Sequence, residues 1–376
     1  MNGLRLGRIL GFEIRVDFSW FIILALVVWS FSSGVFPMEL PGQPSGSYLI
    51  MGLGAALLFF ASLVVHELSH SLVARAKGIK VEGITLFLFG GVARIRSEAK
   101  SPGDEFLIAG VGPLASLAIA LLFAVVARWG SAIGLLPPWL VVARYLAYLN
   151  LVLALFNLLP GFPLDGGRLL RAAAWKRTGD LTRATRLATG SGRLLGWGLV
   201  AWGILEAFQG QVMSGLWLVF IGWYLRNAAA TSYQQHVIRD ILAGVTAART
   251  MTPAPETVSP DLTLSELLDD VFMRRRFVAF PVSDGRQTLG LVTLHQLREV
   301  ARERWPVTRV ADVMVPVGDA CVVSPDESML AVMDRLQASP ARRVLVMREG
   351  VLEGIITASD VAHWLEKARQ IEDIRE

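Results

Sequence analysis

The stretch Leu63-Val64-Val65-His66-Glu67-Leu68-Ser69-His70 places two histidines and a glutamate inside an apolar run that extends over residues 49–75. A helix needs about 20 residues to cross the hydrocarbon core of a bilayer, so this run is long enough to span one. Side chains four residues apart share a helix face, so His66 and His70 can reach one metal ion with Glu67 beside it. Because ionisable groups within a span are costly, a metal site is favoured over a chance or purely structural cluster.

The composition indicates that the rest of the chain is also built largely for a membrane. Of 376 residues, 53% are hydrophobic and 18% charged, which excludes a disordered chain, a disulfide scaffold and an ordinary cytosolic enzyme. The single cysteine, Cys321, excludes internal disulfides and a metal site built from cysteines. We predict a polytopic α-helical membrane protein with about six transmembrane helices, followed by a soluble α/β part. The predicted spans lie near residues 18–34, 49–75, 105–127, 138–159, 191–208 and 212–230.

The positively charged residues predict the orientation of these spans. Lysine and arginine gather in the N-terminal tail, after the second span and after the fourth span, and the opposite connections carry almost none. Cytoplasmic loops carry such an excess, so both termini are predicted to be cytoplasmic in a multi-pass protein of the cell membrane. The formal net charge of +4 is small and scattered, so no nucleic-acid partner is expected.

A third metal ligand has to come from elsewhere in the chain. A catalytic zinc typically has three protein ligands and one open position. The candidate is Asp165, in Asn157-Leu-Leu-Pro160-Gly-Phe-Pro163-Leu-Asp165-Gly166-Gly167, which follows the fourth span on the cytoplasmic side. Asp-Gly is also a common turn pair, so a plain helix-end turn is the alternative. Two imidazoles and a carboxylate suit a zinc ion that hydrolyses amides, and the location makes the substrate a membrane-embedded chain.

Residues 81–96 are too short for a span, and Gly90-Gly91 interrupts a run of strand-forming residues, which predicts a β-hairpin. Extended backbone at membrane depth is tolerated only if it is buried in protein or lines a cavity. The residues themselves leave open whether the hairpin lies on the cytoplasmic surface or is buried in the membrane part.

From about residue 240 the composition becomes that of a soluble domain, and it repeats. Met251-Thr-Pro253 recurs as Met314-Val-Pro316, and Gly290-Leu-Val-Thr293 recurs as Gly354-Ile-Ile-Thr357, at a spacing of about 64 residues. Two copies predict a tandem pair of similar units rather than a longer array.

The histidine motif and the Asn157–Gly167 motif together resemble the site-2 protease family of intramembrane zinc metalloproteases. The closer likeness is to the prokaryotic branch with six spans and C-terminal CBS (cystathionine β-synthase-type) repeats, and it covers essentially the whole chain. It implies that His66, His70 and Asp165 bind one zinc ion and that Glu67 activates the water. It also implies that Asn157 contacts the substrate or the tetrahedral intermediate.

The same resemblance makes the 81–96 segment a re-entrant hairpin that presents or gates the substrate. One position departs from the family pattern, which often has Gly-Pro-x-x-Asn at the start of the third span. This chain has Gly112-Pro113-Leu-Ala-Ser116, so no role can be carried over to the serine.

The resemblance divides the chain into a metalloprotease domain at 1–232, a linker at 233–244 and a tandem CBS domain at 245–376, with repeats at about 245–300 and 308–368. CBS pairs often bind adenine nucleotides, and the ribose-binding pattern is present in the second repeat as Gly354, Thr357 and Asp360. The first repeat has Gln296 in the aspartate position, so at most one intact ribose site is expected. The alternatives left open are that the pair binds ATP, ADP or AMP, or that it serves only homodimerisation.

The function predicted from these residues is hydrolysis of membrane-protein substrates in or near their transmembrane segments, adjusted through the CBS pair. A CBS-regulated transporter would need inverted repeats and an ionisable pathway across the bilayer, which the sequence does not display. A catalytically silent family member is the other alternative, although every catalytic position is filled.

Overall fold

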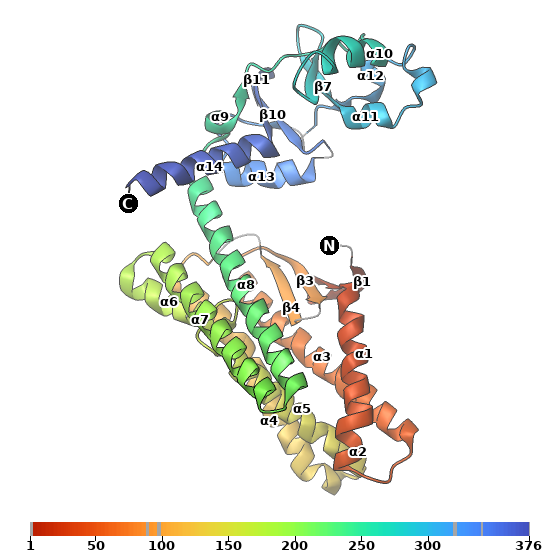
Figure 1. The fold of residues 1–376 in the computed structure, drawn as a ribbon, viewed down its shortest axis with the longest axis vertical. Coiled ribbons are helices and arrows are strands. Elements are labelled where there is room, and N and C mark those ends of the chain that lie inside the picture. Colours follow the sequence, from red (N-terminus) through yellow and green to blue (C-terminus); the bar gives the residue numbers. More distant parts are fainter. Residues whose placement is uncertain (1–2, 88–89, 96–98, 319–321, 340, 376) are drawn as a thin grey trace. The chain divides into compact units, whose positions relative to one another are not determined.

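The computed structural model describes residues 3–87, 90–95, 99–318, 322–339 and 341–375 (Figure 1). Cys321 and Leu88 lie outside the described residues. The chain forms two compact units, residues 1–234 and 235–376, which are described separately below.

The first unit is mainly helical. Its helices are α1 (Phe18–Ser30), α2 (Phe36–Glu39), α3 (Ser45–Ala76), α4 (Pro102–Trp129), α5 (Pro137–Asn157), α6 (Asp165–Thr178), α7 (Leu181–Phe208) and α8 (Val212–Ala243). Within the described residues, four segments are long and apolar enough to cross a membrane, and they coincide with the first four predicted spans: Phe18–Glu39, Ser45–Ala76, Pro102–Ile133 and Pro137–Asn157. The fifth and sixth predicted spans fall on α7 and α8, which remain outside this set.

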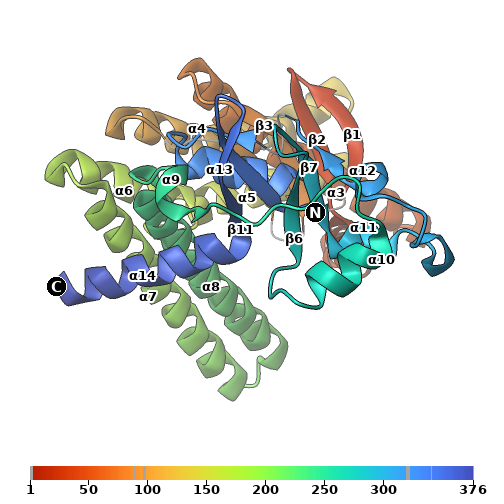
Figure 2. The same ribbon diagram turned by 90° about the horizontal axis from the view of Figure 1, so that it is seen from above.

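Helices α7 and α8 form an antiparallel hairpin and lie side by side in both views (Figure 1, Figure 2). Their backbones touch because glycines face each other along the seam. A Cβ on Gly203 would lie 2.5 Å from the carbonyl oxygen of Gly215, and one on Gly222 would lie 2.5 Å from that of Gly196. Small residues allow this close approach between membrane helices. The turn at residues 209–211 therefore joins two separate helices, as the sequence predicts.

A four-stranded sheet lies beside this helical part. Its strands are β1 (Leu4–Ile9), β2 (Phe12–Val16), β3 (Val81–Phe87) and β4 (Gly90–Ile95), in that spatial order. The β3–β4 pair is antiparallel and corresponds to the hairpin predicted at 81–96. Strand β2 joins the two hairpins by pairing in parallel with β3, so β1 and β4 are the edges of the sheet.

The N-terminal hairpin is an element that the sequence analysis missed, because it treated these residues as a basic tail. The signal was present as the alternation of buried Phe12, Ile14 and Val16 with polar Glu13 and Arg15. Period-two alternation of this kind is typical of a half-buried strand.

The apolar face of the sheet forms a core with α1 and α3. Side chains of β2 and β3 pack in this core with Phe60, Leu63 and Leu68 of α3. The sheet therefore packs against the segment of α3 that carries the two histidines.

The second unit contains two small sheets and short helices. Its elements are α9 (Ala247–Thr250), β5 (Thr252–Pro253), α10 (Leu264–Glu266), β6 (Ala279–Ser283), β7 (Thr288–Thr293), α11 (Leu294–Arg298), α12 (Val310–Val313), β8 (Val315–Pro316), β9 (Val322–Val323), α13 (Met329–Ala338), β10 (Arg343–Arg348), β11 (Val351–Thr357) and α14 (Ala358–Arg375). The repeats exchange their first strands: β5 pairs with β11 of the second repeat, and β8 pairs with β7 of the first. The repeated Met-x-Pro segments of the sequence are these exchanged strands.

Candidate metal centre

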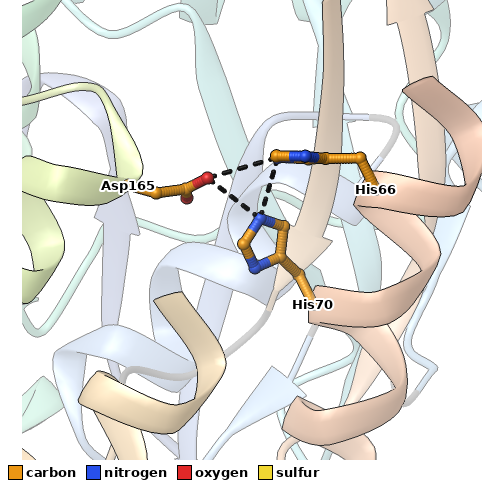
Figure 3. Close-up of side chains that lie close together, drawn as sticks. All are labelled: His66, His70 and Asp165. Carbon is orange, nitrogen blue, oxygen red and sulfur yellow. Dashed lines mark hydrogen bonds and ion pairs between the residues drawn. The ribbon is translucent and has the colours of Figure 1, made fainter. Parts of the chain in front are cut away.

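The two histidines of α3 point to the same place, as their four-residue spacing predicts. Helix α3 is continuous from Ser45 to Ala76, and His66 and His70 are only 2% and 4% exposed. Asp165, the first residue of α6, faces them and is 9% exposed (Figure 3). The structure thus brings the three predicted ligands together in a buried position.

The donor atoms of this cluster form an equilateral triangle. Asp165 Oδ2 lies 3.2 Å from His66 Nε2 and 3.2 Å from His70 Nε2, and the two Nε2 atoms are 3.2 Å apart. Among the described residues, this is the group of histidine, cysteine and acidic side chains that could hold a metal ion.

The size of the triangle fits zinc. Zinc binds imidazole nitrogen and carboxylate oxygen at about 2.0–2.2 Å, usually in a tetrahedron, whose edge is then roughly 3.3–3.6 Å. Three donors 3.2 Å apart therefore match one face of that tetrahedron closely and leave its fourth corner open. Two neutral nitrogens and one carboxylate are also a donor set that suits catalytic zinc.

The outer ring nitrogens have partners on α4, which orient both imidazoles. His70 Nδ1 lies 2.6 Å from the Ile108 carbonyl oxygen, which can only accept, so Nδ1 carries the proton and Nε2 is free to bind a metal. His66 Nδ1 lies 2.9 Å from the hydroxyl oxygen of Ser116, which is fully buried. Ser116, whose role the sequence left open, is thus a contact of a predicted ligand.

A further residue of α4 touches both imidazoles, and the sequence analysis missed its role. A Cβ on Gly112 would lie 2.1 Å from His70 Nε2 and 2.7 Å from His66 Nε2. Only glycine lets α4 approach the cluster this closely. The signal was the Gly112-Pro113 pair, which the sequence analysis noted only as part of a motif.

Asp165 is held by a tightly folded segment before α6. The helix begins at Asp165, so its carboxylate lies at a helix N-terminus, where negative charge is favoured. A Cβ on Gly166 would lie 2.2 Å from the Leu158 carbonyl oxygen, and one on Gly167 would lie 2.3 Å from the Phe162 nitrogen. The two glycines after the aspartate therefore let the chain fold back against its own helix.

Glu67 lies against the hairpin. A Cβ on Gly91 of β4 would lie 2.5 Å from Glu67 Cγ, so the strand passes next to this side chain. The Gly90-Gly91 break that predicted the hairpin therefore has a second effect, because it gives the edge strand room beside the glutamate.

Asn157 is placed differently from the other predicted site residues. It is the last residue of α5, half-buried, and its amide nitrogen donates to the Leu153 carbonyl oxygen at 3.0 Å. Among the described residues, no hydrogen bond joins Asn157 to the three-residue cluster, so a contact with substrate stays a prediction.

Thr357 and Asp360 of the second unit line a cavity of about 280 Å³. Asp360 Oδ2 accepts from the Thr357 amide at 2.8 Å and from its hydroxyl at 2.7 Å, and Oδ1 accepts from the Thr252 hydroxyl at 3.0 Å. Arg343 also lines the cavity, and burial lowers the pKa of its guanidinium.

The first repeat shows what the aspartate position does for the fold. Gln296 Oε1 accepts from the Thr293 amide at 2.9 Å and from its hydroxyl at 2.5 Å, in the same arrangement as Asp360 with Thr357. Both side chains therefore cap the start of a helix, which is a structural task that an amide can also perform.

Comparison with known proteins identifies the family. The profile of Peptidase family M50 matches residues 54–135 and 131–197, and the CBS domain profile matches residues 239–303 and 310–367. Zinc metalloprotease Rip3 of Mycobacterium tuberculosis is 39% identical over 372 residues, which are 98% of this chain and 94% of the relative. Zinc metalloprotease MJ0392 of Methanocaldococcus jannaschii is 28% identical over 359 residues, 95% and 94% of the two chains.

Among solved structures, the Site-2 Protease from Methanocaldococcus jannaschii matches 61% of this chain and 94% of its own, with 27% identity and a TM-score of 0.43. The likeness to Rip3 extends over nearly the full length of both proteins and includes the region of the histidine motif. The chain is therefore a metalloprotease that belongs to Peptidase family M50, the site-2 proteases, and it carries a CBS domain.

Proposed function

We propose that the protein is an intramembrane zinc endopeptidase that cleaves membrane-protein substrates in or near their transmembrane segments. The observation that carries this proposal is the buried triangle of His66, His70 and Asp165, two of which lie on α3, a helix long and apolar enough to span a bilayer. A hydrolytic site at that position meets peptide bonds that ordinary proteases cannot reach.

In this proposal His66, His70 and Asp165 hold one zinc ion through Nε2, Nε2 and Oδ2. When bound there, zinc supplies a Lewis acid that activates water and polarises a peptide carbonyl. Glu67 accepts the proton of the attacking water and returns it to the amide nitrogen as the C–N bond breaks. Asn157 contacts the substrate or the tetrahedral intermediate.

The hairpin gives the substrate a place to bind. A helical peptide bond is shielded and hydrogen-bonded, so it has to unwind before hydrolysis. Strand β4 is an edge of the sheet and passes beside Glu67, so an unwound segment that pairs with it regains backbone hydrogen bonds next to the catalytic base. The proposal also makes this hairpin re-entrant. It places six spans in the cell membrane, with α7 and α8 as the last two, and both termini on the cytoplasmic side.

The CBS pair, in the predicted domain from residue 245, adjusts this activity by binding an adenine nucleotide. Supporting observations are the cavity lined by Thr357 and Asp360, whose carboxylate can accept from ribose hydroxyls, and the half-buried Arg343, whose cation suits a phosphate. Homodimerisation through the same domain is the alternative function of the pair.

The test compares the termini of membrane proteins in cells that carry the wild type or Glu67→Gln. The substitution keeps the three ligands and removes the base, so new termini inside or beside spans are expected only with the wild type. Glu39→Gln, at a glutamate that pairs with Arg144 and Tyr145, is the matched control and should behave as the wild type. Identical termini with the wild type and Glu67→Gln, at equal expression and zinc content, would contradict the proposal.

A further inference from the structure

A buried ion pair joins α4 and α6, and the catalytic roles described above do not use it. Glu105 of α4 is fully buried and Arg171 of α6 is 8% exposed. Arg171 Nε donates to Glu105 Oε1 at 2.6 Å, and Nη2 donates to the same oxygen. Arg168 Nε lies 4.0 Å from that oxygen. Burying such a pair is costly unless its geometry is good, and replacement by apolar residues is often neutral for stability, so stability alone does not account for it.

The pair belongs to a face of α4 that also contacts the metal cluster. Glu105, Ile108, Gly112 and Ser116 recur every three to four residues and so lie along one side of the helix. Ile108 binds His70 and Ser116 binds His66, while Gly112 allows both rings to approach. This face fixes the two ligands that α3 supplies.

Within the part of the chain that the structure describes, no hydrogen bond joins Asp165 itself to α4, and Arg171 supplies a link indirectly. Arg171 follows Asp165 on α6, and its guanidinium carbon lies 5.0 Å from the ring centroid of Phe162, in the segment that leads into Asp165. The same guanidinium is bonded to Glu105. One side chain therefore ties both the helix and the preceding segment to α4.

We propose that Glu105 and Arg171 are positioning residues that set the place of the Asp165 carboxylate relative to the two imidazoles. The proposal rests on the proposed zinc site. The planar guanidinium fork of Arg171 directs two N–H groups at one oxygen of Glu105, which restricts direction as well as distance, and apolar contacts between the same helices do not. Breaking the pair should therefore change how the metal is held, even where the fold persists.

The test uses the purified full-length chain with both charges replaced, Glu105→Leu together with Arg171→Met. Neither charge of the pair then stays buried without its partner, and Arg168, the other neighbour of Glu105, is only half-buried, so the melting temperature should stay near that of the wild type. Zinc affinity, measured by competition with a chelator, should fall ten- to 100-fold, as for other residues that orient ligands. The visible absorption of the cobalt(II)-loaded protein should also change, because it reports ligand geometry. Wild-type zinc affinity together with an unchanged cobalt spectrum would overturn the proposal.

The matched control replaces an exposed ion pair away from the cluster, Glu39→Leu with Arg144→Met, and should leave zinc affinity and the cobalt spectrum unchanged.

If the Glu105/Arg171 double variant does not fold, Arg171→Lys decides, since it keeps the charge but loses the fork. Weaker zinc binding by that variant supports the proposal, and wild-type binding overturns it. A wild-type protein that binds neither zinc nor cobalt would instead refute the metal site itself.

Discussion

At the scale of single residues, one methyl group added at Gly112 should be enough to weaken zinc binding. In Gly112→Ala the new methyl group would lie 2.1 Å from His70 Nε2, so the ring or the helix has to move. Overpacking of this kind typically costs about 1–3 kcal/mol, and the displaced ring loses its alignment. We expect zinc affinity to fall at least about tenfold, measured by chelator competition.

Gly110→Ala on the same helix is the control for that change. Its Cβ would lie 3.9 Å from Leu169 Cδ2, an ordinary contact, so zinc binding should be retained. Equal zinc affinity in the two alanine variants would show that the close approach of α4 does not shape the site.

Ser116→Ala tests the orientation of His66. The substitution leaves the buried Nδ1 without its hydroxyl partner, which costs roughly 1–3 kcal/mol and lets the ring rotate. Zinc affinity should fall about ten- to 100-fold. Ser62→Ala, at a buried serine whose hydroxyl donates to Leu58 on its own helix, should bind zinc like the wild type. A Ser116→Ala protein indistinguishable from Ser62→Ala would refute the role of Ser116.

The clustering of His66, His70 and Asp165 was predictable at this scale because the signals are local or chemically rare. The histidine pair follows from helix periodicity, and Asp165 was chosen because the membrane part has no further histidine and the aspartate follows the fourth span on the same side. The contacts of Ser116 and the pair of Glu105 with Arg171 are different, since they join residues far apart in the chain and depend on how α4 packs. No spacing in the sequence reports such contacts.

At the scale of secondary-structure elements, the hairpin should be separable from the metal site. Leu86 of β3 pairs with Val16 on one side and Gly91 on the other. Proline there removes an amide from an inner strand and distorts the ladder that holds β4. We expect Leu86→Pro to reduce substrate cleavage strongly while zinc content stays intact, measured by cleavage assay and metal analysis.

Leu6→Pro is the control for the hairpin, since Leu6 is exposed on β1, the opposite edge of the sheet. Edge strands tolerate proline better, so cleavage should persist. Undiminished cleavage by Leu86→Pro would remove the hairpin from the mechanism.

The elements were predictable in proportion to how local their signals are. The β3–β4 hairpin was visible from its strand formers and its glycine break, whereas β2 pairs in parallel with β3 across a long stretch of chain that contains all of α3. The recurring Met-x-Pro and Gly-x-x-Thr segments also revealed the repeats of the second unit. The exchange of β5 and β8 between their sheets was not visible, because a short strand does not indicate which partner it will pair with.

At the scale of the whole molecule, nucleotide binding by the CBS pair is the prediction that links the proposed proteolysis to its regulation. Asp360→Asn keeps a side chain that can cap α14, as Gln296 caps α11 in the first repeat, but removes the negative charge proposed to accept hydrogen bonds from ribose hydroxyls. We expect affinity for the nucleotide that binds among ATP, ADP and AMP to fall at least about tenfold by calorimetric titration.

The control is Asp312→Asn, which makes the same change at an exposed cap of α12 and should leave binding unchanged. No heat with any of the three nucleotides in the wild type would leave homodimerisation as the role of the pair.

The face of α4 that carries Glu105, Ile108, Gly112 and Ser116 also limits where residues can be inserted or deleted in the chain. One residue added or removed between positions 108 and 116 would rotate everything beyond it by about 100° around the helix axis. Ser116 would then face away from His66 while Ile108 still held His70. Substitutions at positions of this stretch outside the face can be accommodated one at a time, but its length is fixed, so insertions and deletions among homologues should fall outside it.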